Sequence, residues 1–227
     1  MKRSLLMFIN ACLLGLMVAA SGCAVAPAHE PQTLLKMVGV KSEASHLSDS
    51  VVVIIDAQRE YVDGKLRLDG IDASLKEASI MLERARKAGT PVIHVVHKGK
   101  PGGVLFNPDG PYFEIASAVA PKQDEPVVVK TLPNAFAGTK LEDLISKTGR
   151  KNLIVIGYMT HMCVSTTVRA ALDKGYRTTV VAGATATRDL PDGSGGTVSA
   201  KDVQRANLAA LADRFATVVQ SAKEISE

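Results

Sequence analysis

The 227-residue sequence contains no tryptophan, and its aromatic residues make up only 4% of the chain. This scarcity argues against the aromatic surfaces on which single-stranded nucleic acids stack. A strong charge of one sign is also absent, because the net charge is +4 and falls to +2 without Lys2 and Arg3. The longest apolar run, residues 5–20, is shorter than the roughly 20 residues that span a membrane. We therefore expect neither a nucleic-acid-binding protein nor a membrane-spanning bundle.

What the chain does contain at its start is the pattern of an export signal. Residues 1–22 combine two basic residues with an apolar stretch and end in small residues before Cys23. This ending resembles the lipobox of bacterial lipoproteins, although that family prefers Leu where this chain has Ala20. The resemblance implies removal of residues 1–22 and a lipid such as palmitate on Cys23. We expect residues 23–48 to be a lipidated tether that joins the membrane to a domain of residues 49–227.

This interpretation places the protein in the bacterial cell envelope, with its domain in the periplasm or outside the cell. The alternative is an ordinary secretory signal that is cut near Ala26 or Ala28 and releases a soluble protein. In both cases Cys12 and Cys23 belong to the export region, so Cys163 is the only cysteine of the predicted domain. A single thiol forms no internal disulfide; it is buried and inert, paired between chains, or reactive.

Apolar runs rich in β-branched residues alternate with segments of helical periodicity along the domain. The runs predict six strands, and the periodic segments predict helices between them. Strands are expected at 51–55, 91–96, 127–129, 153–156, 178–181 and 216–219, and helices at 71–87, 141–148, 163–174 and 197–215. A long loop at 97–126 has one candidate short helix at 113–119. The pattern predicts an α/β fold with a doubly wound, mostly parallel six-stranded sheet and helices on both faces.

Three chemically reactive side chains fall at the same edge of this predicted sheet. Asp56 follows the first strand, Lys130 follows the third, and Cys163 opens the helix after the fourth. Ligands of such sheets bind beyond the carboxyl ends of the strands. A helix N-terminus and a lysine both lower the pKa of a cysteine, and Asp56 is suited to move its proton. The alternatives are an Asp that caps a turn, a surface Lys and a core Cys.

Three segments carry a resemblance to a known family. They are Val53-Ile54-Ile55-Asp56-Ala57-Gln58, Lys130-Thr131-Leu132-Pro133-Asn134-Ala135-Phe136 and Gly157-Tyr158-Met159-Thr160-His161-Met162-Cys163-Val164. Together they resemble the isochorismatase-like cysteine hydrolases, which include nicotinamidases and related amidohydrolases. The resemblance runs from about residue 50 to 215 and implies a Rossmann-like fold and a homo-oligomer.

The resemblance also implies roles for individual residues. Asp56 corresponds to the general base, Lys130 to its charge partner and Cys163 to the nucleophile. A cis peptide bond is implied between Tyr158 and Met159, with the backbone amides of Met159 and Cys163 forming the oxyanion hole.

The chain departs from the nicotinamidases because it has no Asp-x-His pair for a metal. We therefore expect no metal and no cofactor. Side chains in or near the strand-end loops are candidates for the substrate pocket or for ordinary packing: Gln58, Tyr61, His97, Phe106, Phe136, Tyr158 and His161.

These observations predict a metal-independent cysteine hydrolase that cleaves a small amide-like or related C–N bond. Its expected partners are a small-molecule substrate and a membrane, and nucleic acid is not among them. Two alternatives stay open: a lipid-anchored small-molecule-binding protein on a hydrolase scaffold, and a redox protein that uses the Cys163 thiol.

Overall fold

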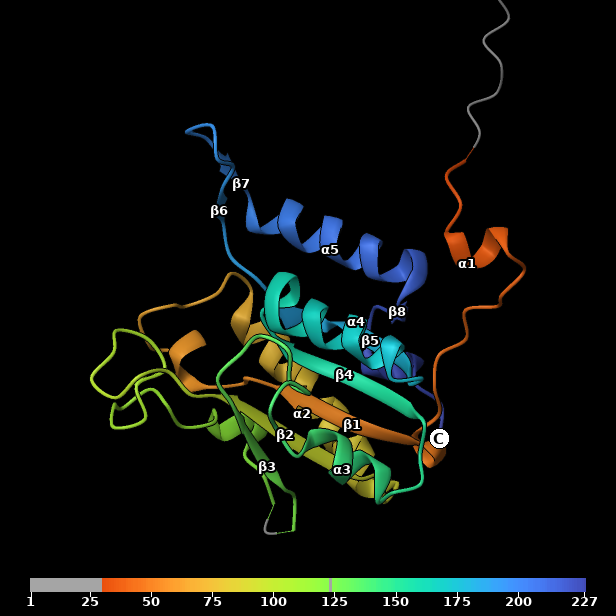
Figure 1. Ribbon diagram of the computed structural model, residues 1–227, viewed down its shortest axis with the longest axis horizontal. Helices are drawn as coiled ribbons and strands as arrows, with labels where there is room; N and C mark the ends of the chain where they lie inside the picture. Colours follow the sequence, from red (N-terminus) through yellow and green to blue (C-terminus); the bar gives the residue numbers. More distant parts are fainter. Residues whose placement is uncertain (1–29, 123) are drawn as a thin grey trace, which may run out of the picture. The chain divides into compact units, whose positions relative to one another are not determined.

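Six strands form one parallel sheet in the computed structural model, which describes residues 30–122 and 124–227 (Figure 1). Their order across the sheet is β3-β2-β1-β4-β5-β8, and every neighbouring pair is parallel. The strands are β1 (Ser50–Ile55), β2 (Val92–His97), β3 (Val127–Lys130), β4 (Asn152–Tyr158), β5 (Arg177–Ala186) and β8 (Thr217–Val219). The predicted fold is confirmed. The strand order reverses direction between β1 and β4, which is where ligands of such sheets bind.

The sheet is buried on both faces because its central strands are apolar at every position. All six residues of β1 are buried. Val52 and Ile54 join the apolar cluster on one face, and Val51, Val53 and Ile55 join the cluster on the other. This alternation is the two-residue period of a strand, repeated on two covered faces.

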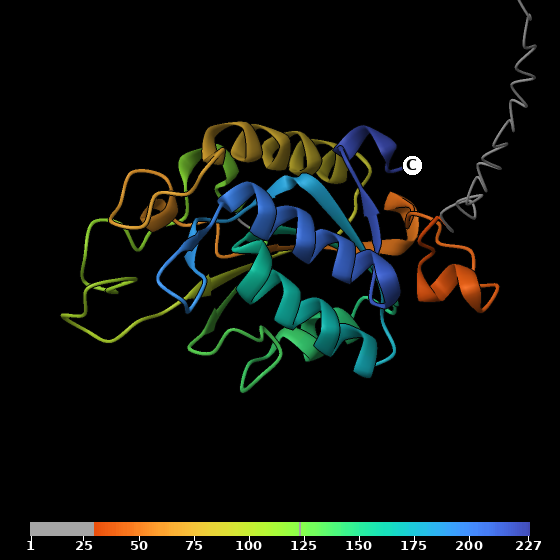
Figure 2. The ribbon, with the colours of Figure 1, turned by 90° about the horizontal axis from the view of Figure 1, so that it is seen from above.

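Helices cover the two faces of the sheet unequally (Figure 2). One long helix, α2 (Ile71–Lys87), packs its buried side chains into the first cluster. The helices α3 (Leu141–Ser146), α4 (Ser165–Asp173) and α5 (Ala200–Arg214) contribute to the second. Shorter elements are α1 (Leu34–Met37), the 3₁₀ turns Leu47–Asp49, Arg59–Tyr61, Ser117–Val119 and Ala222–Glu224, and an antiparallel pair of β6 (Leu190–Pro191) and β7 (Thr197–Val198).

Two predicted helices begin elsewhere than expected. The segment predicted as a helix at 163–174 starts with a π-helical turn at Thr160–Val164, and α4 follows it. The segment predicted at 197–215 starts at Ala200, because Thr197–Val198 pairs with β6 and Ser199 caps the helix. The Ser199 side chain accepts a hydrogen bond from the Asp202 amide, which satisfies a free backbone N–H of the first turn.

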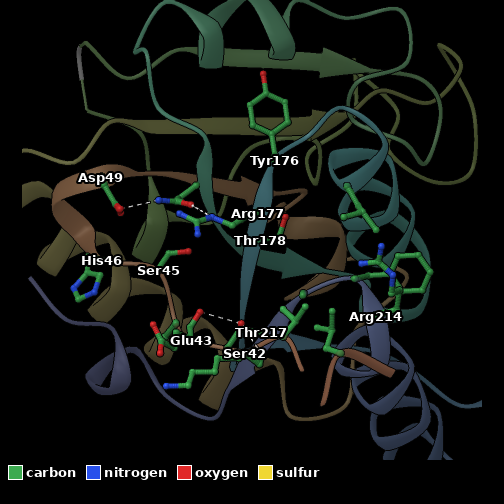
Figure 3. A pocket seen from close by; sticks show the side chains of 18 residues that line it. Ser42, Glu43, Ser45, His46, Asp49, Tyr176, Arg177, Thr178, Arg214 and Thr217 are labelled. Atoms are coloured by element: carbon green, nitrogen blue, oxygen red, sulfur yellow. Dashed lines mark hydrogen bonds between the residues drawn. The ribbon is translucent and has the colours of Figure 1, made fainter. Parts of the chain in front are cut away.

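We expected residues 23–48 to be a tether, but the part of this segment from Leu34 onward contacts the domain. The Leu34 amide donates to the Asp213 carboxylate, the Ser45 amide donates to the Thr179 hydroxyl, and Leu47 is buried. Together with the amino-terminal ends of the strands, this segment lines a cavity of about 310 Å³ (Figure 3).

The predicted signal peptide and Cys23 lie outside the described residues. In the part of the chain that the structure describes, no helix has the length and apolarity needed to cross a membrane.

Candidate active site

Asp56, Lys130 and Cys163 meet at the carboxyl-terminal edge of the sheet. The Lys130 Nζ atom lies 2.7 Å from Asp56 Oδ2 and 3.2 Å from Cys163 Sγ. All three residues are buried, with exposed fractions of 0%, 1% and 4% for Asp56, Lys130 and Cys163. The ammonium group therefore lies between a carboxylate and a thiol and is shielded from water.

The strands and the turn after β4 place these three side chains. Asp56 directly follows β1 and has φ 51°, a left-handed conformation that Asp adopts more readily than most residues. Lys130 is the last residue of β3, where it pairs with His97 of β2. Because β2 lies between β3 and β1, the long Lys130 side chain spans one strand to reach Asp56. Cys163 lies in the π-helical turn between β4 and α4.

Burial raises the pKa of Asp56 to about 6, and the positive charge of Lys130 opposes this rise. The backbone around Asp56 donates no hydrogen bond to its carboxylate in the described residues. A carboxyl group with a pKa near 6 is ionised at neutral pH, yet is basic enough to accept and return a proton during a reaction. The environment of Asp56 therefore suits a general base.

The pKa of Cys163 differs from our expectation. We predicted a lowered value, but burial and the negative charge of Asp56 raise the pKa of Cys163 to about 12, against the effect of Lys130. The reason is that the sequence shows the cation and the helix start but does not show how completely the site excludes water. Cys163 is therefore a thiol at rest, and a thiolate must form by proton transfer to a base within the site.

The close approach of β1 and β4 beside the site requires glycine at position 157. Gly157 has φ 113° and pairs with Ile55, and an added Cβ would overlap the Ile55 carbonyl oxygen. The peptide bond between Tyr158 and Met159 is cis. The Met159 carbonyl then accepts hydrogen bonds from the amides of Met162 and Val164 and so closes the turn that holds Cys163.

His97 lies against the triad and not at a distant part of the pocket. Its Nδ1 atom is 3.3 Å from Lys130 Nζ, and its ring contacts Phe106 edge-to-face at 5.2 Å between ring centres. Burial and the charge of Lys130 lower the pKa of His97 to about 4. The imidazole is therefore neutral at pH 7, and Nδ1 is able to accept a hydrogen bond from Lys130.

Gln58 and Glu60 hold the loop that follows β2. The fully buried Gln58 amide donates to the carbonyls of His97 and Phe113 and accepts from the His97 amide. The buried Glu60 carboxylate accepts from the amides of Lys65 and Phe106. We considered Gln58 for the substrate pocket, but both its Oε1 and its Nε2 atoms bond to backbone groups. Glu60 was not predicted, because no motif distinguishes a buried loop acid from a surface one.

Among the predicted pocket aromatics, Tyr61 and Phe106 lie near the triad. Their rings meet edge-to-face at 5.1 Å, and burial, followed by the negative charge of Asp56, raises the pKa of Tyr61. Tyr158 contacts Tyr61 at 5.9 Å but is completely buried in the core. Phe136 belongs to the apolar cluster on the opposite face of the sheet from Tyr61, and this cluster also contains Cys163.

Phe136 packs in the second apolar cluster, where its ring stacks on Tyr176 at 6.0 Å. The same cluster contains Cys163, so membership of it does not separate Phe136 from the site. The sequence could not separate these cases, since all four aromatics lie at or after a predicted strand end and only the tertiary fold decides which cluster each ring enters.

His161 and Arg188 are two further polar residues near the site. The His161 Nδ1 atom lies 2.5 Å from the Thr187 hydroxyl oxygen. Burial, followed by the charge of Arg188, lowers the pKa of His161. The same charge opposes the rise in the pKa of Tyr61, so the Arg188 guanidinium lies within electrostatic range of both residues. The Arg188 Nε atom is buried and has no hydrogen-bond partner in the described residues. Arg188 lies in a segment that the sequence marked only as a loop.

No group of three or more His, Cys, Asp or Glu side chains in residues 30–122 and 124–227 has the arrangement of a metal site. The chemistry that the described residues offer is that of a carboxylate, an ammonium group and a thiol in contact. Such a set can transfer a proton from the thiol and use the sulfur as a nucleophile.

Comparisons with known proteins identify the family of this chain. The sequence profile described as the isochorismatase domain matches residues 50–223. The chain is 40% identical over 185 residues to the secreted isochorismatase effector Isc1 of Verticillium dahliae, which covers 82% of this chain and 95% of that protein. It is 36% identical over 173 residues to a streptothricin hydrolase of Streptomyces noursei, covering 75% and 68%.

The fold is shared with a solved structure. An isochorismatase from Pseudomonas putida KT2440 has 40% sequence identity and a TM-score of 0.82, covering 86% of this chain and 99% of that chain. The profile match across most of the chain, the two relatives and the common fold show that this protein belongs to the isochorismatase family of hydrolases.

Proposed function

We propose that this protein cleaves a small amide-type C–N bond through a covalent intermediate on Cys163. The observation that carries the proposal is the buried contact of one ammonium group with both a carboxylate and a thiol. The name of the Streptomyces noursei relative, a streptothricin hydrolase, supports hydrolysis as the reaction class. The neutral thiol of Cys163 and the raised pKa of Asp56 then assign the order of proton transfers.

In the first half-reaction, Asp56 accepts the thiol proton while the Cys163 sulfur attacks the carbonyl carbon. Lys130 stays protonated and stabilises the negative charge as it moves from carboxylate to sulfur. The carbonyl oxygen becomes an oxyanion, for which we propose the backbone amides of Met159 and Cys163 as donors. Asp56 then protonates the leaving nitrogen, the C–N bond breaks and a thioester remains on Cys163.

In the second half-reaction, water replaces the departed amine. Asp56 accepts a proton from the water as its oxygen attacks the thioester carbonyl. The C–S bond breaks, Cys163 regains its proton and a carboxylic acid leaves. No metal or cofactor takes part in these steps as proposed. Tyr61, Phe106 and His161 are proposed to contact the substrate, with the Arg188 guanidinium facing a polar group of it.

Mass spectrometry tests the covalent step. The purified protein is incubated with a panel of small amides and ureides, and peptide mapping locates any adduct. We expect an acyl adduct on Cys163 in the wild type, none in Cys163→Ala, and loss of turnover in that variant. The matched control is Met162→Ala, which changes a neighbouring exposed side chain of the same turn. Turnover by Cys163→Ala would refute the nucleophile.

The same experiment separates the other two candidate functions. A binding protein would retain the unchanged ligand in both wild type and Cys163→Ala. A redox protein would form a sulfenate on Cys163 with peroxide and no acyl adduct with the amides and ureides.

We also propose that the chain is exported, with residues 1–22 as a signal peptide and Cys23 as a lipidated first residue. A shorter tether than residues 23–48 then leads to the hydrolase domain, because residues from Leu34 onward already contact the domain of residues 49–227. The signal-like sequence supports export, and the word "secreted" in the name of the Verticillium dahliae relative agrees with it. A soluble secreted form cut after Cys23 is the alternative.

The mass of the mature N-terminal peptide decides between these forms. A lipid on Cys23 predicts an acylated peptide and a protein in the membrane fraction, and Cys23→Ser should release it. Cys12→Ser is the matched control, because that residue is removed with the signal in both cases. An unmodified N-terminus beyond Cys23 in wild type would refute lipidation.

We further propose a homo-oligomer. The edge strand β3 has two half-exposed apolar side chains, Val127 and Val129, which are suited to contact another subunit. Light scattering after size-exclusion chromatography measures the mass, and Val129→Lys should reduce it. A wild-type mass of one chain would refute the proposal.

A further inference from the structure

The Lys130 ammonium group has three acceptors around it in the buried site. They are Asp56 Oδ2 at 2.7 Å, Cys163 Sγ at 3.2 Å and His97 Nδ1 at 3.3 Å. A protonated lysine has three N–H donors and no acceptor, so each contact uses one donor. The first two acceptors belong to the reaction proposed above, and the third has no role in it.

The position of His97 is fixed from three directions. Its backbone is held by the Gln58 side chain. The His97 amide donates to Gln58 Oε1 at 2.8 Å, and the His97 carbonyl accepts from Gln58 Nε2 at 3.1 Å. Its ring packs edge-to-face on Phe106. The Phe106 amide in turn donates to the buried Glu60 carboxylate at 2.9 Å. The imidazole is therefore held by packing and buried hydrogen bonds, as a group that orients a reactive side chain must be.

The charges around the imidazole also fix its protonation. Lys130 faces Nδ1 at hydrogen-bond distance, and a proton on that nitrogen would put two donors against each other. The Lys130 ammonium also contacts Asp56 and Cys163, and Glu60 accepts a hydrogen bond from the neighbouring Phe106 amide. A neutral ring with its proton on Nε2 leaves Nδ1 free to accept the hydrogen bond from Lys130.

We propose that His97 is a positioning residue, which accepts a hydrogen bond from Lys130 through Nδ1 and so holds the ammonium group between Asp56 and Cys163. This inference rests on the proposed function for its catalytic consequence, but the hydrogen bond itself can be tested without a substrate. Because Lys130 supports both the carboxylate and the developing thiolate, a displaced ammonium slows the reaction without weakening substrate binding.

Nitrogen NMR of the wild-type full chain tests the hydrogen bond directly. The chain has only five histidines, so ¹⁵N-histidine labelling gives few signals. We expect the His97 ring to keep an unprotonated Nδ1 and a protonated Nε2 from pH 5 to pH 8. A ring with its proton on Nδ1, or one that becomes fully protonated above pH 6, would overturn the proposal.

Two substitutions test the consequence. His97→Leu removes the acceptor, whereas His97→Asn keeps an oxygen near the place of Nδ1. We expect kcat to fall roughly tenfold or more in His97→Leu, with KM changed less than threefold, as for loss of a hydrogen bond to a charged group. His97→Asn should recover most of the loss. His46→Leu, an exposed histidine outside the site, is the control.

The rate at which iodoacetamide alkylates Cys163 gives a readout that needs no turnover. We expect the same order of rates in this assay: wild type, His97→Asn, then His97→Leu. Equal rates in all three, or equal loss in both variants, would overturn the positioning role. If Cys163→Ala retained turnover while these alkylation rates followed the expected order, the proposed function would fail and the His97 contact would stand.

Discussion

Replacing Lys130 with methionine tests how far one buried charge controls the site. The substitution keeps much of the side-chain volume and removes the ammonium group that lies 2.7 Å from Asp56. Lys130 is the strongest influence that opposes the effect of burial on the pKa of Asp56. Without it, the carboxyl group is buried with no positive charge in contact, and its pKa must rise further above 6.

The size of the effect follows from the usual influence of a neighbouring charge. An opposite charge in contact lowers the pKa of a carboxyl group by about 1 to 3 units, so its loss moves the pKa of Asp56 from about 6 to about 7–9. At pH 7 the base is then between half and almost fully protonated. We expect kcat/KM at pH 7 to fall about tenfold from this cause alone, and more because the thiolate also loses its cation.

The assay is the pH dependence of kcat/KM, with the rate of Cys163 alkylation as a second measure. Wild type should lose activity below about pH 6, and Lys130→Met should lose it below a pH that is one to three units higher. Lys174→Met is the control, because Lys174 forms a surface ion pair with Glu142 at 2.6 Å and such pairs contribute little. An acid limb that stays near pH 6 in Lys130→Met would refute the assigned role of Lys130.

Two further predictions concern stability, both measured by urea unfolding. Gly157→Ala should destabilise the fold by several kcal/mol, since the added Cβ meets the Ile55 carbonyl. Gly138 is also at positive φ but in open space, so Gly138→Ala should cost about 1 kcal/mol. Similar losses in both variants would contradict this explanation. Hydrogen bonds from Arg86, the Lys122 amide and His94 outweigh burial and lower the pKa of Glu125 to about 2. A lowered carboxyl pKa stabilises the fold above the unfolded value near 4.5 and is lost as the pH falls toward 2. Glu125→Gln should therefore cost about 2 kcal/mol at pH 7 and much less at pH 2.5, after allowance for partial hydration; a cost that does not change with pH would contradict the linkage.

The order of elements was predictable from the sequence because each depends on local pattern. Buried parallel strands need continuous apolar runs such as 51–55, and helices between them show the 3.6-residue period of α2. Parallel topology then places every strand's carboxyl end at one edge, so Asp56, Lys130 and Cys163 could be grouped although 33 or more residues separate them along the chain. Their contact distances agree with that grouping.

What the tertiary structure alone decided was the environment of each group. The thiol pKa of Cys163 depends on how fully neighbouring elements exclude water, which no local pattern records, and the sequence-based expectation had the wrong direction. The same holds for His97, whose Nδ1 faces Lys130 only because β2 and β3 pair in one register. Local sequence determines which chemical groups arrive at the edge of the sheet, whereas burial and register, which depend on distant segments, determine how those groups behave.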